Sequence, residues 1–226
     1  MNGVPLSALH AGGSLAFRIA GEPTARPRRL LLLSHGVGGN ETNLAALADG
    51  LAGDTLAILP RAPLEMGMGQ YAWFPVSFGP QGPRPDLAAA ELSRQRLAAF
   101  VAGVQERHGI PPAMTVIAGF SQGGIISASV GLTRPELVRG FGVLSGRILP
   151  ELEPLLADRE ALSRIDAFVG HGRDDSKLPV DWAHRADAWL RQLGVAHETR
   201  LYPGDHAIPP AMRDDFLAWF ERLTQA

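Results

Sequence analysis

The sequence predicts an α/β fold in which a mainly parallel sheet carries helices on both faces. Three observations lead to this prediction. Short apolar runs alternate with longer amphipathic segments along nearly the whole chain. Several of the apolar runs are continuous, which is typical of parallel strands covered on both faces. No internal repeat, low-complexity tract or linker divides the chain, so we expect a single domain over residues 1–226.

The expected strands are short, and most are apolar throughout. Residues 29–34 form one continuous run, and residues 55–59 form a second that Pro60 closes. Two shorter apolar stretches, 6–10 and 15–20, lie on either side of Gly12 and Gly13 and favour an edge hairpin. Further buried strands are expected at residues 114–118, 141–146, 165–170 and 198–202.

The expected helices are recognised by their ends and their apolar faces. Asp86 is a suitable N-cap for a long helix over residues 86–108, and Gly109 is its stop signal. A helix is also expected over residues 40–51, with Asn40 or Thr42 as its cap. Other helices are expected at residues 122–133, 182–193 and 209–223, with a short one within 149–163.

Composition and charge exclude several classes of function. A net charge of −2 provides no basic field for nucleic acid and no polybasic membrane anchor. The absence of cysteine excludes disulfides, thiolate zinc sites and a cysteine nucleophile, and no His and carboxylate cluster has the spacing of a metal site. The first residues do not resemble a signal peptide, and no apolar run approaches the roughly 18 residues of a membrane span. We therefore expect a soluble cytoplasmic protein.

The pattern Gly119-x-Ser121-x-Gly123 lies between an expected strand and an expected helix. This is the pattern of a nucleophile elbow, in which a very tight turn holds a serine in a strained conformation with positive φ. Glycines are needed two positions before and after the serine because side chains there would collide across the turn. The pattern recurs by chance in a chain with 26 Gly, so its weight depends on what lies at the other strand ends.

Chemically useful residues follow three more of the expected strands. In a doubly wound sheet, ligands bind beyond the carboxyl ends of the strands, so these residues are expected to meet at one edge. Val37 lies in the glycine-rich stretch 35–39, Asp175 follows the strand at 165–170, and His206 follows the last strand. The order Ser, Asp, His is that of α/β-hydrolases and differs from that of other serine hydrolases.

This order assigns each residue a role. Ser121 is the expected nucleophile, His206 the general base and acid, and Asp175 the carboxylate that orients the imidazole. The neighbouring Asp174 stays an alternative for the acid. The backbone N–H groups of Val37 and Gln122 are expected to form the oxyanion hole.

Four motifs together resemble the phospholipase/carboxylesterase family, which contains acyl-protein thioesterases and small bacterial carboxylesterases. They are residues 33–40, residues 119–124, His171-Gly172-x-x-Asp175-x-x-Leu178-Pro179 and Gly204-x-His206. The resemblance covers about residues 28–223. It implies a small α/β-hydrolase without a large lid domain that cleaves carboxylic esters, and in some members thioesters or lysophospholipids, without a cofactor. In this resemblance the acid matches Asp175, and Ser176 stands where members often have proline.

Residues 60–86 are rich in proline and glycine and are expected to be irregular. The stretch is unusually apolar for a loop, which permits two interpretations: a packed Ω-like loop or the wall of an acyl pocket. The pocket candidates, which include a Trp-Phe pair that also resembles the family and a leucine of the acid motif, are Leu64, Met66, Met68, Trp73, Phe74 and Leu178.

Other polar residues near the motifs are expected to be structural. His35, His171 and the side chain of Gln122 are expected to brace loops by hydrogen bonds, and Asp205 to be a solvated turn residue. The expected partner is a small-molecule acyl ester, with no nucleic acid and no stable membrane anchoring. Whether a homodimer forms stays open. A thioesterase or lysophospholipase activity also stays open, and so does a non-catalytic binding role on the same scaffold.

Overall fold

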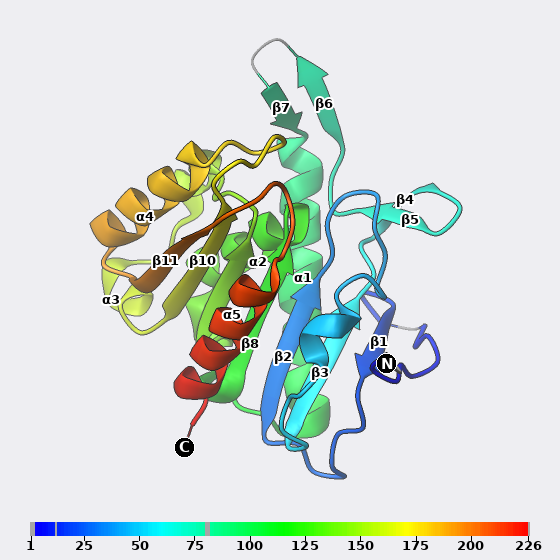
Figure 1. Cartoon of the computed structure of the whole chain (residues 1–226). Coiled ribbons are helices and arrows are strands. Elements are labelled where there is room, and N and C mark those ends of the chain that lie inside the picture. The colour runs from blue at the N-terminus through cyan, green and yellow to red at the C-terminus, as the bar shows by residue number, and fades with distance from the viewer. Residues whose placement is uncertain (1–2, 12, 80–81, 226) are drawn as a thin grey trace.

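A seven-stranded sheet forms the centre of the computed structural model, which describes residues 3–11, 13–79 and 82–225 (Figure 1). The strand order is β1-β3-β2-β8-β9-β10-β11, and every neighbouring pair is parallel except β1 with β3. The predicted α/β class is therefore confirmed. The strands are β1 (Phe17–Ala20), β2 (Arg29–Ser34), β3 (Thr55–Pro60), β8 (Thr115–Phe120), β9 (Gly140–Leu144), β10 (Asp166–Gly172) and β11 (Ala196–Tyr202).

Helices cover both faces of the sheet, because the central strands are apolar on both sides. On β2, Leu30 and Leu32 belong to one core cluster, whereas Leu31 and Leu33 belong to the other. The first cluster packs under α1 (Leu87–His108), α2 (Gln122–Thr133), α3 (Arg159–Leu162) and α4 (Asp181–Leu193). The second packs under α5 (Pro210–Leu223), which lies on the opposite face in Figure 1.

Local signals placed the long helix α1 correctly. The side chain of Asp86 accepts a hydrogen bond from the N–H of Ala89 at 3.0 Å, as an N-cap does. Gly109 ends the helix with a φ of 65°, a left-handed conformation that favours glycine. None of the helices in the described part of the chain is long and apolar enough to cross a membrane.

The helix predicted over residues 40–51 is wrong. This segment forms turns and one short 3₁₀ helix, η1 (Ala45–Ala48). The side chain of Asn40 accepts hydrogen bonds from the N–H and hydroxyl of Thr42, and the side chain of Asn43 accepts one from the N–H of Asn40. Such local bonds offer the backbone an alternative to helical pairing.

The irregular structure predicted for residues 60–86 is also wrong. The segment forms two antiparallel hairpins that project from the sheet in Figure 1. One pairs β4 (Leu64–Gly67) with β5 (Gln70–Ala72), and the other pairs β6 (Val76–Gly79) with β7 (Gly82–Pro85). The β4–β5 turn contains Gly69 with a φ of 73°.

The predicted N-terminal hairpin is present only in part. Residues 17–20 form the edge strand β1, while Leu6 and His10 make isolated antiparallel bridges to Ala20 and Phe17. Gly12, at the expected turn, lies outside the described residues.

Candidate active site

Ser121 occupies the tight turn between β8 and α2. Its φ of 52° and ψ of −116° confirm the predicted strained conformation. The flanking glycines are required by contact: a Cβ on Gly119 would lie 2.4 Å from the carbonyl carbon of Gly123, and one on Gly123 would lie 1.9 Å from the carbonyl oxygen of Ser34. The turn therefore packs directly against the end of β2.

The structure brings Ser121, His206 and Asp175 together in one hydrogen-bonded chain. His206 Nδ1 lies 2.7 Å from Asp175 Oδ2, and His206 Nε2 lies 3.0 Å from Ser121 Oγ. Since an ionised carboxylate only accepts, Nδ1–H donates to Asp175 and leaves Nε2 to accept the hydroxyl proton of Ser121. This is the arrangement that a general base needs to activate a serine. Asp174, in contrast, is exposed.

Asp175 is buried and oriented by its own loop. Its Oδ1 accepts hydrogen bonds from the N–H groups of Lys177 and Leu178, at 2.9 and 2.8 Å. The ring of His171 donates from Nε2 to the carbonyl of Leu178 at 2.7 Å, as predicted for a bracing histidine. These bonds leave Oδ2 directed at His206.

Asp205 ties the loop of His206 to the loop of Asp175. Its Oδ1 accepts hydrogen bonds from the N–H groups of His206 and Ser176, both at 2.7 Å, and its Oδ2 accepts one from the Ser176 hydroxyl at 3.1 Å. These bonds, chiefly the one from the Ser176 N–H, lower the pKa of Asp205. The prediction of a merely solvated turn residue missed this link, because Ser176 lies 29 positions away. A proline at position 176 would lack the donating N–H.

The glycine-rich stretch after β2 lies beside the elbow. Gly36 and Val37 line the same cavity as Ser121, and Val37 is 44% exposed. The stretch is attached to the β4–β5 hairpin, since Gly38 N–H donates to Tyr71 O and Tyr71 N–H to Gly39 O. Gln122 begins α2, where N–H groups have no partner within the helix. Both residues of the predicted oxyanion hole thus border the cavity, and their donor role stays a prediction.

Buried side chains brace these loops, as predicted for His35 and Gln122. His35 donates from Nδ1 to Gly36 O at 2.7 Å and accepts at Nε2 from the N–H of Ala62 at 3.1 Å. Burial lowers the pKa of His35 and so favours this neutral form. The Gln122 amide accepts from Trp73 N–H at 2.8 Å and donates to Phe74 O at 2.7 Å.

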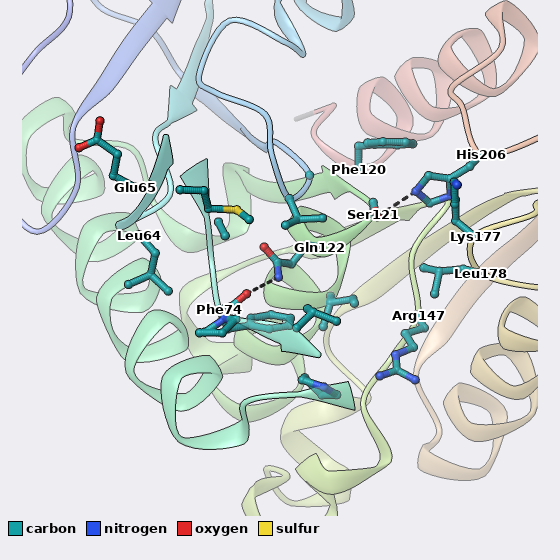
Figure 2. Close-up of a pocket in the computed structure, with 18 residues that line it drawn as sticks. Leu64, Glu65, Phe74, Phe120, Ser121, Gln122, Arg147, Lys177, Leu178 and His206 are labelled. Carbon is teal, nitrogen blue, oxygen red and sulfur yellow. Dashed lines mark hydrogen bonds between the residues drawn. The ribbon is translucent and has the colours of Figure 1, made fainter. Parts of the chain in front are cut away.

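A cavity of about 610 Å³ opens beside Ser121, and both hairpins contribute to its wall (Figure 2). Four of the predicted pocket residues line it: Leu64, Met66, Phe74 and Leu178. The predictions for Met68 and Trp73 are wrong. Met68 is fully exposed at the turn of the β4–β5 hairpin, whereas Trp73 is fully buried and donates its indole N–H to His35 O at 2.9 Å.

Ser121, His206, Val37 and Gln122, predicted for the chemistry, also line the cavity, whereas the other lining residues were not predicted. They come from segments far apart in the sequence and include Glu65, Val76, Phe120, Ile125, Arg147 and Lys177. Within the described ranges, no group of three or more His, Asp or Glu residues could hold a metal ion.

The fold and this constellation define an α/β-hydrolase with a serine at its elbow. A family model described as Phospholipase/Carboxylesterase matches residues 18–221. The chain belongs to this family of enzymes, which hydrolyse esters.

Named relatives and solved structures agree with this assignment. The chain is 27% identical to acyl-protein thioesterase 1 of Kluyveromyces lactis, over 82% of this chain and 91% of that protein. It is 24% identical to the protein of that name from Emericella nidulans, over 87% and 90%. Among structures, esterase PE8 shares 27% identity with a TM-score of 0.77 and 98% coverage of both chains. A carboxylesterase from Mesorhizobium loti shares the fold at 22% identity, with a TM-score of 0.80 over 96% and 98% of the chains.

Proposed function

We propose that the chain is a serine carboxylesterase that cleaves esters of small to medium acyl chains through an acyl-enzyme on Ser121. The observation that carries the proposal is the hydrogen-bonded chain from Asp175 through His206 to Ser121, at the wall of an apolar cavity. The substrate is a small-molecule ester, water is the second reactant, and the proposed catalytic groups all belong to this chain. Its cytoplasmic location remains a prediction from the sequence.

The proposed reaction has two halves. In the first, Ser121 Oγ adds to the ester carbonyl while its proton passes to His206 Nε2. The tetrahedral oxyanion is stabilised by the N–H groups of Val37 and Gln122, each worth about 3–4 kcal/mol in the transition state. The bond to the alcohol oxygen then breaks, and His206 gives its proton to that oxygen.

In the second half, water replaces the alcohol. His206 takes a proton from the water as it adds to the acyl-enzyme carbonyl, and the proton then returns to Ser121 Oγ as the acid leaves. Asp175 keeps the proton on Nδ1 throughout and stabilises the imidazolium that forms in each half.

The test is Ser121→Ala assayed with 4-nitrophenyl butyrate. We expect kcat to fall by about 10⁴-fold or more, because removal of the nucleophile disables the whole triad. Ser127→Ala is a matched control: its hydroxyl is buried in α2 and has no hydrogen-bond partner within the described chain, so activity should persist. A Ser121→Ala variant as active as the wild type would overturn the proposal.

Acyl-protein thioesterase activity is a second candidate, because curated relatives carry that name. The tetrahedral chemistry is shared, so the site geometry does not separate esters from thioesters. Rates on an ester and a thioester with the same acyl chain would decide between them, and a lysophospholipid can join the same panel. A folded protein whose Ser121 fails to react with a fluorophosphonate probe would instead favour a binding role.

A further inference from the structure

The cavity beside Ser121 is apolar along most of its wall but carries two cations on one side. Figure 2 shows Arg147 and Lys177 near Leu178, on the side of Ser121 away from Leu64 and Glu65. We propose that Arg147, assisted by Lys177, binds an anionic group, a carboxylate or a phosphate, carried by the ester substrate. The inference rests on the proposed esterase function and narrows its substrate class to anionic esters.

Arg147 is buried to an extent unusual for arginine, with only 8% of its surface exposed. Burial lowers its pKa, and the attraction of Glu151 offsets only part of that cost. Arg29, which is also strongly buried, shows how carboxylates stabilise such a charge: although burial opposes it, hydrogen bonds to Glu221 and Asp54 raise its pKa. An anion in the cavity would add the same kind of attraction to the charge of Arg147.

The loop that carries Arg147 is held close to the nucleophile. Ser145 donates from its N–H to Gly170 O at 2.8 Å and from its hydroxyl to Ala207 O at 2.9 Å. Gly146 packs against the elbow so closely that a Cβ there would lie 2.8 Å from Ser121 O. Arg147 follows directly after these two residues. Its side chain therefore enters the cavity wall from a backbone that is held against the elbow.

The guanidinium itself is oriented by an aromatic ring. Arg147 Cζ lies 4.5 Å from the ring centroid of Trp182 on α4, a cation–π distance. A guanidinium fixed in one plane is suited to bind a carboxylate or phosphate through two parallel hydrogen bonds.

The other charges around the cavity favour an anion on this side. The carboxylate of Asp175 is already bound to His206 and to its own loop. Glu65 lies away from the cations, beside Leu64 (Figure 2). Lys177, the single lysine of the chain, is exposed at the rim, where it can attract an anion as it enters.

Two substrate pairs test the proposal and identify which arm of the ester carries the anion. For the acyl arm, mono(4-nitrophenyl) adipate is compared with its neutral methyl ester. For the alcohol arm, 4-acetoxybenzoate is compared with its methyl ester. The quantity measured is the anionic-to-neutral ratio of kcat/KM within each pair, compared between the wild type and each variant.

We expect Arg147→Met to lower this ratio by about 10- to 100-fold for one pair, the range of a hydrogen bond to a charged group. Arg147→Lys should retain part of the ratio. Arg185→Met is the matched control: Arg185 also lies over Trp182, at 4.9 Å, but is exposed on α4 and does not line the cavity. A fall in the first pair assigns the anion to the acyl arm, and a fall in the second assigns it to the alcohol arm.

An unchanged ratio in both pairs would overturn the proposal. So would equal losses on the charged and neutral members, because Arg147 would then serve only to hold Trp182. If Arg147→Met does not fold, Lys177→Met replaces it. A smaller fall in the ratio is then expected for one of the two pairs, and the absence of any fall would overturn the proposal. A wild-type protein that hydrolyses neither member of either pair would overturn the proposed function itself, and this inference with it.

Discussion

An alanine at position 123 tests how the elbow holds Ser121. A Cβ on Gly123 would lie 1.9 Å from the carbonyl oxygen of Ser34 and 2.6 Å from that of His35. Both are backbone atoms at the end of β2, so no side-chain rotation can relieve the overlap. Because ordinary contact begins at 3.4 Å, α2 and β2 would have to separate by about 1.5 Å.

The structure sets the size of the expected effect. Overpacking a well-packed core costs about 1–3 kcal/mol and occasionally more, and a backbone-on-backbone overlap belongs at the upper end or above. At about 2–4 °C per kcal/mol for a chain of this length, the Tm should fall by about 6–12 °C. Activity should fall further, since a displacement of about 1 Å at the reacting groups can cost about 100-fold.

Gly103→Ala is the control for the loss of glycine flexibility. Gly103 lies inside α1, and a Cβ there would have no neighbour within 4 Å. Alanine should therefore stabilise the helix by about 1 kcal/mol and leave activity unchanged. The measurements are thermal unfolding by circular dichroism and kcat/KM on 4-nitrophenyl butyrate. A Gly123→Ala protein with wild-type Tm and kcat/KM would refute the packing argument.

Two further predictions concern carboxylates near the site. Asp205→Ala should lower kcat by about 10-fold or more with little change in Tm, because the exposed Asp205 positions His206. Asp205→Asn should recover part of the rate, while Asp174→Ala should match the wild type; equal rates in all three variants would contradict this role. The second prediction concerns Glu41, whose pKa the hydrogen bonds from Arg61 lower from 4.5 to about 2. Its stabilisation, about 3 kcal/mol, should be complete above pH 4.5 and disappear as the pH falls through about 2. Glu41→Gln should therefore lower the free energy of unfolding at pH 7, and this free energy, measured by urea unfolding, should depend less on pH below 4.5 than in the wild type. A pH dependence identical to that of the wild type would count against the prediction.

The framework of the fold could be predicted from local signals. The apolar residues of β2 pack into both core clusters. A continuous apolar run predicts burial on two faces without any knowledge of the neighbouring strands. Asp86 and Gly109 mark the ends of α1 by their own backbone preferences. These signals depend on residues within one turn or one strand.

The errors near the site have a different origin. The 3₁₀ helix at 45–48 and the two hairpins after β3 are set by side-chain bonds and tertiary contacts rather than by periodicity. Trp73 illustrates this, since its N–H and indole bind Gln122 and His35 from elements distant in sequence. A composition rich in proline and glycine predicted a loop and could not reveal this pairing.

The candidate triad was predictable for a topological reason. Parallel strands place their carboxyl ends at one edge, so Ser121 and His206 meet although they are 85 positions apart. The link from Asp205 to Ser176 and the position of Arg147 were not predictable, because nothing in their local sequence specifies the partner.

The sequence by itself determined the sheet class, the strained turn at Ser121 and the order of the residues that meet there. These follow from residue types and from backbone geometry that short segments carry on their own. Only the tertiary structure decided which side chains form the cavity: Trp73 and Phe74 were both predicted for the pocket, and of the two Phe74 alone lines it. Both side chains are buried, and contacts with distant segments, such as the hydrogen bond from the Trp73 indole to His35, decide which of them faces the cavity. Such contacts also place Arg147, which lies over Trp182, in the wall of the cavity that Ser121 lines.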